Sequence, residues 1–260
     1  MSDRVDDVPE WSRVKVTRHG GVTEARLHTD GGSLVFDSTV HREIVEVADW
    51  LRQDAHTRAV VFGGTGDVFC TDIDTPSFRK GSWQDVWVEG RRGLGGLLDI
   101  EVPVIGVVNG PARIHAELVV IADVVLACPE ATFADHAHFT KGIVPGDGVQ
   151  TVWPRLLGPT RGSYFLLTGQ ELSAEEAMRL GVVHEIHPRD RLYARALELG
   201  SGMARLPVET LMYTRMLLRS EDRRLFGENV SHGLALAGLD MYLTGKRFTS
   251  PAPPDKEKSP

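Results

Sequence analysis

Side chains that can transfer protons are concentrated in one short stretch of the 260-residue chain, between positions 129 and 154. Set among its glycines and prolines are Asp135, His136, His138, Lys141 and Asp147. An imidazole titrates near neutral pH, so a histidine placed here can take a proton from water and return it later. The residue types alone leave two interpretations open, a proton-transfer site or a polar loop with a turn aspartate in Gly-Asp-Gly.

Rigid elements are expected on both sides of this stretch. An apolar, strand-like run over 119–128 precedes it, and an amphipathic segment that begins near Gln150 follows it. Loops that a rigid scaffold holds in this way often carry catalytic residues.

The first two thirds of the chain alternate between strand and helix patterns. A hairpin is expected over 12–36, and a helix from Thr39 with Asp37, Ser38 or Thr39 as its N-cap. Further elements are expected as a strand over 58–62, a helix over 88–98, a strand over 101–109, a helix containing 117–122 and a strand over 124–127. This alternation predicts an α/β fold.

The last third is mainly helical. Ser173 and Glu176 form a capping-box motif, and a short strand is expected over 182–186. Helices are expected over 190–205, 208–218 and 223–243. The predicted organisation is a flexible N-terminus over 1–11, an α/β core over 12–188, a helical region over 189–245 and a disordered polar tail over 246–260.

Composition limits the possible partners. A net charge of −7 and a pI near 5.8 argue against nucleic-acid binding, which relies on clustered Lys and Arg. No apolar run approaches the roughly 20 residues of a membrane helix, and the acidic N-terminus lacks the apolar centre of a signal peptide. We therefore expect a cytoplasmic protein with no membrane partner.

Cofactor motifs are not apparent. The glycines over 63–66, expected as a turn, match neither a dinucleotide fingerprint nor a phosphate-binding loop. Two cysteines, Cys70 and Cys128, are too few for a Cys-rich zinc site, and no His-x-x-x-His or His-Glu-x-x-His spacing occurs. Neither a metal nor another cofactor is expected.

Four motifs in this order resemble the crotonase superfamily, which has the enoyl-CoA hydratase and isomerase fold. They are VVFGGTGDVFCTDID, IEVPVIGVVNGPARIHAELVVIADVVLA, ATFADHAHFTKGIVPGDG and LLTGQELSAEEAMRLGVVHEI. The resemblance implies a spiral α/β core of ββα units. It also implies a homotrimer or a dimer of trimers, with the region over 189–245 contributing to trimerisation.

Two departures weaken an assignment as a hydratase. After Asn109-Gly110, hydratases carry several glycines before a glutamate, whereas this chain has Pro-Ala-Arg-Ile-His-Ala before Glu117. A second hydratase glutamate is expected near the 129–154 stretch, but there is no Glu between Glu130 and Glu171. Action on a CoA thioester therefore stays an alternative.

Other segments resemble the branch typified by 6-oxocamphor hydrolase, whose members cleave a carbon–carbon bond of cyclic β-diketones without CoA. The segments are HFxxGIVPGDG, SLVFDSTVH and YFLLTGQEL. The resemblance implies a catalytic pair of His138 and Asp147, with His115 as a further active-site residue. The glutamate which that branch carries in its final helix is replaced by Ala237.

In this interpretation His138 activates water, Asp147 orients its imidazole and His115 donates to the oxyanion. The residues expected to bind substrate are Phe36, His41, Cys70, Asp72, Trp83, Trp87 and Phe139. The predicted enzyme is a β-diketone hydrolase that acts on a small cyclic or bicyclic diketone. A non-catalytic binding member of the fold is the second alternative.

Overall fold

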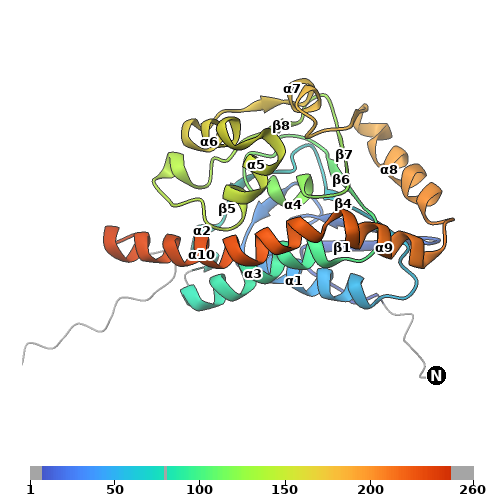
Figure 1. The fold of residues 1–260 in the computed structure, drawn as a ribbon, viewed down its shortest axis with the longest axis horizontal. Helices are drawn as coiled ribbons and strands as arrows, with labels where there is room; N and C mark the ends of the chain where they lie inside the picture. Colours follow the sequence, from blue (N-terminus) through green and yellow to red (C-terminus); the bar gives the residue numbers. More distant parts are fainter. Residues whose placement is uncertain (1–7, 79–80, 247–260) are drawn as a thin grey trace, which may run out of the picture.

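The computed structural model describes residues 8–78 and 81–246, so the predicted ends at 1–7 and 247–260 lie outside the described residues. A six-stranded sheet with the order β1-β2-β4-β6-β7-β10 forms the centre (Figure 1). The strands are β1 (Val14–His19), β2 (Val22–Leu27), β4 (Ala59–Gly64), β6 (Val104–Val108), β7 (Val124–Ala127) and β10 (Glu185–Ile186). β1 and β2 form the predicted antiparallel hairpin, and the other neighbours are parallel.

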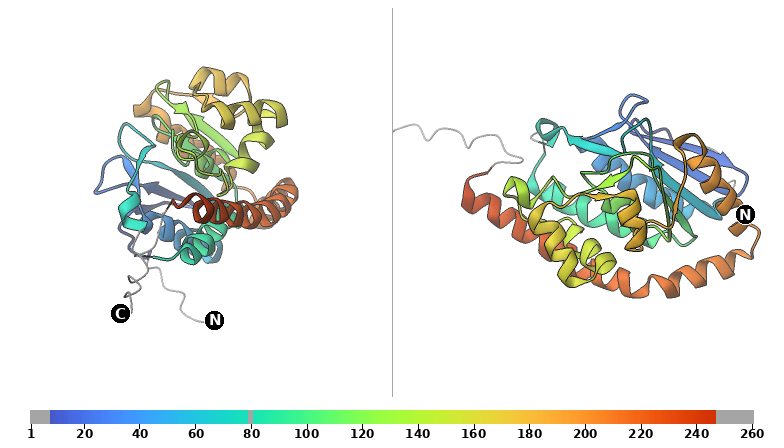
Figure 2. Two further views of the ribbon diagram at one scale, coloured as in Figure 1. Left: turned by 90° about the vertical axis from the view of Figure 1, so that its left-hand side faces the viewer. Right: turned by 90° about the horizontal axis from the view of Figure 1, so that it is seen from above.

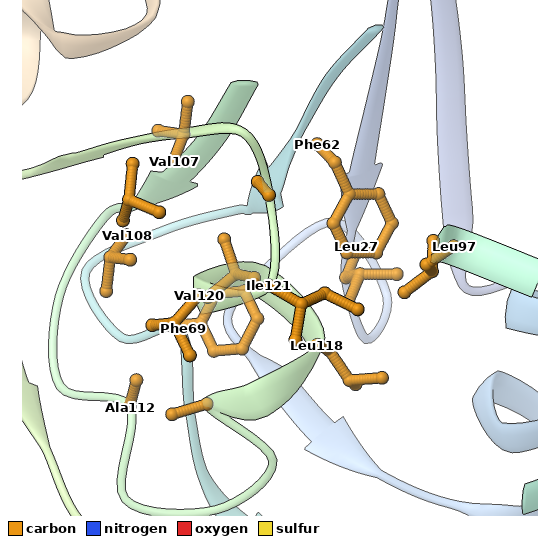
Figure 3. Close-up of a cluster of buried hydrophobic side chains, with 14 of the residues drawn as sticks. Leu27, Phe62, Phe69, Leu97, Val107, Val108, Ala112, Leu118, Val120 and Ile121 are labelled. Carbon is orange, nitrogen blue, oxygen red and sulfur yellow. The ribbon is translucent and has the colours of Figure 1, made fainter. Parts of the chain in front are cut away.

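The two central strands are buried along their whole length. Every residue of β4 (AVVFGG) and of β6 (VIGVV) is buried, as expected for parallel strands covered on both faces. Phe62 and Val107 of these strands belong to the cluster of apolar side chains in Figure 3, together with Leu118 of the following helix.

Gly63 and Gly64 continue β4 and do not form the turn that the sequence predicts. A Cβ atom on Gly63 would lie 2.6 Å from the carbonyl oxygen of Val107 on the neighbouring strand. Glycine is therefore needed here for close packing of the strands, a role that local sequence cannot distinguish from a turn.

A second, smaller layer carries the site. β3 (Leu34–Phe36) pairs in parallel with β5 (Cys70–Ile73), and β8 (Thr132–Phe133) pairs with β9 (Leu172–Ser173). Isolated bridges from Cys70 to Ala112 and from Ala112 to Phe133 join the two pairs. This layer places Phe36, the segment after Ala112 and the loop after β8 next to one another.

Two helices form the wall beside this layer. In α1 (Ser38–Gln53), the Asp37 side chain accepts from the backbone N–H groups of Thr39 and Val40, as predicted for an N-cap. α3 (Trp83–Asp99) begins five residues earlier than expected, because Ser82 and Asp85 form a capping box. Trp83 and Trp87 are therefore helical, although the helix was expected only from position 88.

The remaining helices include three that the sequence did not predict, at 75–78, 139–141 and 159–168. The remaining helices are α2 (Thr75–Phe78), α4 (Glu117–Val120), the 3₁₀ turn η1 (Phe139–Lys141), α5 (Val149–Leu157), α6 (Pro159–Thr168), α7 (Ala174–Arg179), α8 (Arg189–Met203), α9 (Val208–Leu218) and α10 (Ser220–Thr244). β10 is shorter than expected, because the N–H groups of Val182 and Val183 bond to the carbonyl of Ala177 at the end of α7.

The C-terminal helices lie on different parts of the core. α8 packs against β4 and β6, whereas α10 runs along the outside beside α3 and α5 (Figure 2). Among the described helices, none combines the length and the apolar character needed to cross a bilayer.

Candidate active site

His138 lies between two carboxylates. Its Nδ1 is 2.8 Å from Asp135 Oδ1, and its Nε2 is 3.1 Å from Asp147 Oδ2. Asp135 follows β8 directly, and Asp147 returns to the site because the chain turns back after η1, where Ile143 N–H bonds to the carbonyl of His138. The predicted His138–Asp147 contact is present, but the orienting position at Nδ1 belongs to Asp135.

The two carboxylates and the histidines beside them determine which protonation states His138 and Asp147 adopt. Burial would lower the pKa of His138, but Asp147 and Asp135 outweigh burial and raise it well above the ordinary value of 6.5. Burial would raise the pKa of Asp147, but the nearby imidazoles of His138 and His115 hold it well below its usual range. In its resting form the group is therefore an imidazolium between two carboxylates.

His115 lies on the other side of Asp147. Its Nδ1 is 2.7 Å from Glu117 Oε1 and 3.6 Å from Asp147 Oδ2. The ring is packed on Phe36, with centroids 3.8 Å apart. Its backbone is left-handed, with φ of 52°, which is uncommon for a residue other than glycine and is frequent at functional sites.

Glu117 is the partner that holds the His115 ring. Its side chain is buried, and burial raises its pKa. Burial alone would lower the pKa of His115, yet Glu117 and Asp147 raise it. The result is a strong hydrogen bond that fixes Nδ1, while no hydrogen bond from the described residues engages Nε2.

A third histidine has the same arrangement. His41 Nδ1 lies 2.8 Å from Glu89 Oε2, which joins α1 to α3. The rings of Phe36 and Phe78 meet the His41 ring edge-on, at centroid distances of 5.9 and 5.7 Å.

A single pocket brings these groups together. It is partly open to solvent. The ionisable side chains in its lining are His41, His115, His138 and Asp147. Its other walls are mainly apolar and include Phe36, Ile73, Phe78, Trp83, Val86, Leu234, Ala237 and Met241.

Three predicted site residues therefore line the pocket beside the catalytic candidates, namely Phe36, His41 and Trp83. The amide of Cys70 already donates to the carbonyl of Pro111, so it is not available to an oxyanion. Burial also raises the pKa of the Cys70 thiol to about 12, so the thiol stays protonated. Asp72 is exposed and accepts from the N–H of Ile73.

Two predicted aromatic residues also lie outside the lining. Trp87 Nε1 donates to the carbonyl of Ser231, and the guanidinium of Arg91 lies 4.8 Å from its ring centroid. Phe139 is 47% exposed on η1. Cys70, Asp72, Trp87 and Phe139 are therefore not pocket residues in this structure.

Sequence reasoning missed three carboxylates that hold the histidines. Asp135 and Glu117 had a usable signal, because each lies within three positions of its histidine. Glu89 had none, since it is 48 positions from His41 and reaches it only through helix packing.

Three groups here could also hold a cation. His115, Glu117 and Asp147 each offer a ligand atom, and these atoms lie within 4.8 Å of one another. Nitrogen and carboxylate oxygen together suit Zn²⁺ or a similar ion. A metal at Nδ1 would have to displace the hydrogen bond between His115 and Glu117.

Comparisons with known proteins place the fold. The family model described as enoyl-CoA hydratase/isomerase matches residues 18–226. Carnitinyl-CoA dehydratase of Citrobacter koseri is 32% identical over 191 residues, which cover 72% of each chain.

Solved structures agree with this placement. The β-diketone hydrolase of Anabaena sp. PCC 7120, bound to (S)-3-oxocyclohexyl acetic acid, is 40% identical with a TM-score of 0.87, covering 90% of this chain and 96% of that one. An enoyl-CoA hydratase/isomerase of Mycobacterium paratuberculosis is 23% identical with a TM-score of 0.82, covering 90% and 94%, and shows the fold alone. The chain thus belongs to the enoyl-CoA hydratase/isomerase family of the crotonase superfamily, as its motifs predicted.

Proposed function

We propose that this protein hydrolyses a carbon–carbon bond of a cyclic or bicyclic β-diketone to give a keto acid. The observation that carries the proposal is the connected group Asp135–His138–Asp147–His115 in the lining of one apolar pocket. Such a group can activate water and stabilise an oxyanion without a cofactor.

Water activation follows from the two protonation states of His138. The imidazolium donates Nε2–H to Asp147, so no water fits into the 3.1 Å contact. When Nε2 loses its proton, both atoms are acceptors and repel each other. A water molecule that donates one hydrogen to each can then enter, with Asp135 still holding Nδ1.

Carbonyl attack forms one bond and moves one proton. The water oxygen adds to the first carbonyl carbon, and its proton passes to His138 Nε2. The resulting oxyanion accepts from Nε2–H of His115, whose Nδ1 is held by Glu117. A donor aimed at developing charge contributes about 3–4 kcal/mol in other enzymes.

Collapse of this intermediate breaks the bond between the first carbonyl carbon and the carbon that separated the two carbonyls. The electron pair moves into an enolate with the second carbonyl, and the imidazolium of His138 protonates that carbon. The product is a single keto acid, which retains all the atoms of the cyclic diketone and of one water.

The pocket lining supports a neutral substrate. Among the described residues that line it there is no Lys or Arg, whereas the phosphates of CoA call for basic groups. The Anabaena relative binds a keto acid, which is the class of product expected here.

A panel of cyclic and bicyclic 1,3-diketones tests the proposal, with keto-acid formation followed by mass spectrometry. We expect turnover of at least one member. If none is consumed and the diketones only bind, the protein is a non-catalytic binding member of the fold.

Action on a CoA thioester is the second candidate, because curated relatives at about 30% identity are carnitinyl-CoA dehydratases. The geometry does not favour it, since Glu117 is turned to His115 and does not line the pocket. Isothermal titration with CoA and with crotonyl-CoA separates the two candidates. If the protein hydrolyses diketones, neither CoA nor crotonyl-CoA should bind. Micromolar binding would favour action on a CoA thioester.

A further inference from the structure

We propose that the His41–Glu89 pair binds the second carbonyl oxygen of the diketone and stabilises the enolate that forms there. This inference rests on the proposed function and adds a catalytic residue, His41, and a positioning residue, Glu89. The residues of the final helix that line the pocket, Leu234, Ala237 and Met241, include no acid.

His41 is identified by comparing the ionisable side chains of the pocket with the groups that the reaction needs. Four ionisable side chains line it, and three already have roles: His138 and Asp147 at the water, and His115 at the first carbonyl. The second carbonyl also becomes negatively charged in the reaction, since the electrons of the broken bond move onto its oxygen. Two side chains of the lining with an N–H group remain, His41 and Trp83. The indole nitrogen of Trp83 lies against Gly238 of α10, whereas His41 is held by a carboxylate, so His41 is the better placed donor.

The pair is held in one orientation. Glu89 Oε2 lies 2.8 Å from Nδ1, so with both ring nitrogens protonated Nδ1–H donates to the carboxylate and Nε2–H is presented for a ligand. Phe36 and Phe78 meet the ring edge-on and restrict its rotation. The side chain is only 14% exposed, so its hydrogen bonds are little weakened by water.

Space at Nε2 depends on a glycine. A Cβ atom on Gly90 would lie 3.6 Å from His41 Nε2 and 3.2 Å from Leu234 Cδ1. Gly90 and Gly93 also line a smaller cavity that adjoins the main pocket, and His41, His115 and Asp147 line both. Helix α3 therefore leaves room beside the donor nitrogen.

The test uses the keto acid as a probe of enolate formation. In D₂O, an enzyme that stabilises this enolate exchanges the hydrogen on the carbon that separated the two carbonyls, without any attack by water. We expect the parent protein to catalyse this exchange. His41→Ala should lose about 10²–10³-fold in both exchange and hydrolysis, by analogy with removal of an oxyanion donor.

Two further variants separate donation from packing. His41→Gln keeps an N–H donor and should retain part of the exchange activity that His41→Ala loses. Glu89→Gln removes the carboxylate that holds Nδ1 and should lower kcat more than it changes KM.

Helix α3 supplies a matched pair of variants that does not alter His41. Gly90→Ala places a methyl group beside Nε2 and should slow exchange at least tenfold, whereas Gly95→Ala, with no atom within 4 Å of its Cβ, should not. The inference is overturned if folded His41→Ala exchanges and hydrolyses within threefold of the parent. If the parent still hydrolyses diketones, the proposed function stands and only the role of His41 is wrong. If the parent consumes no diketone, the proposed function and the role of His41 are both contradicted.

Discussion

His138 Nε2 lies 3.1 Å from Asp147 Oδ2, although nine positions separate the two residues in the chain. The contact exists because the segment after η1 turns back on itself, and a second carboxylate, Asp135, holds Nδ1 at 2.8 Å. Two anions on one imidazole stabilise its protonated form, so the base of the proposed reaction is protonated in its resting state.

This relationship predicts an unusual pH dependence. The base is active only when neutral, and its pKa is raised well above 6.5, so kcat/KM should increase with pH through a midpoint above 6.5. Asp135→Asn removes one of the anions that raise the pKa, and should move that midpoint to lower pH. The pH–rate profiles of both proteins check this, with Asp72→Asn as the control because Asp72 is exposed and outside the lining. A midpoint at or below 6.5 in the parent, or one that Asp135→Asn leaves unmoved, would count against the mechanism.

The backbone of His115 predicts that two variants differ in stability but lose similar activity. Its φ of 52° is accessible to glycine without a steric cost, whereas alanine keeps the strain. His115→Gly should therefore be more stable than His115→Ala by about 1 kcal/mol. Both variants should lose about 10²–10³-fold in kcat, because each lacks the oxyanion donor. Urea unfolding and steady-state kinetics measure the two effects, and a more stable alanine variant would show that the strain argument is wrong.

The sequence predicts an element well when the pattern that defines it is local, and poorly when the element depends on contacts with distant segments. β7 and α9 have the predicted bounds, because their signals are local: β7 is a continuous apolar run, and Pro207 directly precedes the first residue of α9. The start of α3 was missed because the cap at Ser82 precedes the apolar pattern by several residues. Gly63 and Gly64 look like a turn unless the neighbouring strand is known.

The site shows the same division. The pocket lining contains His138, Asp147 and His115, together with Phe36, His41 and Trp83. Their parts in catalysis and in substrate binding stay predictions. Cys70 and Asp72 belong to a strand whose pairing, unknown from the sequence, determines what their backbone and side chains contact. The Glu89 contact arises from the packing of α1 on α3, for which no short-range pattern exists.

Exposed apolar side chains on the C-terminal helices support self-association, and we expect a homotrimer or a dimer of trimers. Leu217 and Leu218 of α9 are 78% and 70% exposed, and Tyr242 and Leu243 of α10 are 83% and 71% exposed. Large exposed apolar surface of this kind commonly marks an interface. Light scattering should give three or six times the chain mass of 28.6 kDa.

Two aspartates introduced on α9 test whether its exposed leucines lie in the subunit interface. The double substitution Leu217→Asp and Leu218→Asp should lower the particle mass, whereas Met178→Asp on the distant helix α7 should not. A parent protein that is monomeric at micromolar concentration would refute the expected assembly.

The most direct test of the central claim is hydrolysis of a 2,2-disubstituted or bicyclic 1,3-diketone in H₂¹⁸O, with parent protein and His138→Ala compared. The account predicts a keto acid with one ¹⁸O in its new carboxylate, formed by the parent and slowed by about 10²–10⁴-fold in the variant. His136→Ala, two positions away and outside the pocket lining, should behave like the parent. Equal rates for parent and His138→Ala, or no ¹⁸O in the product, would contradict the proposal that His138 activates the hydrolytic water.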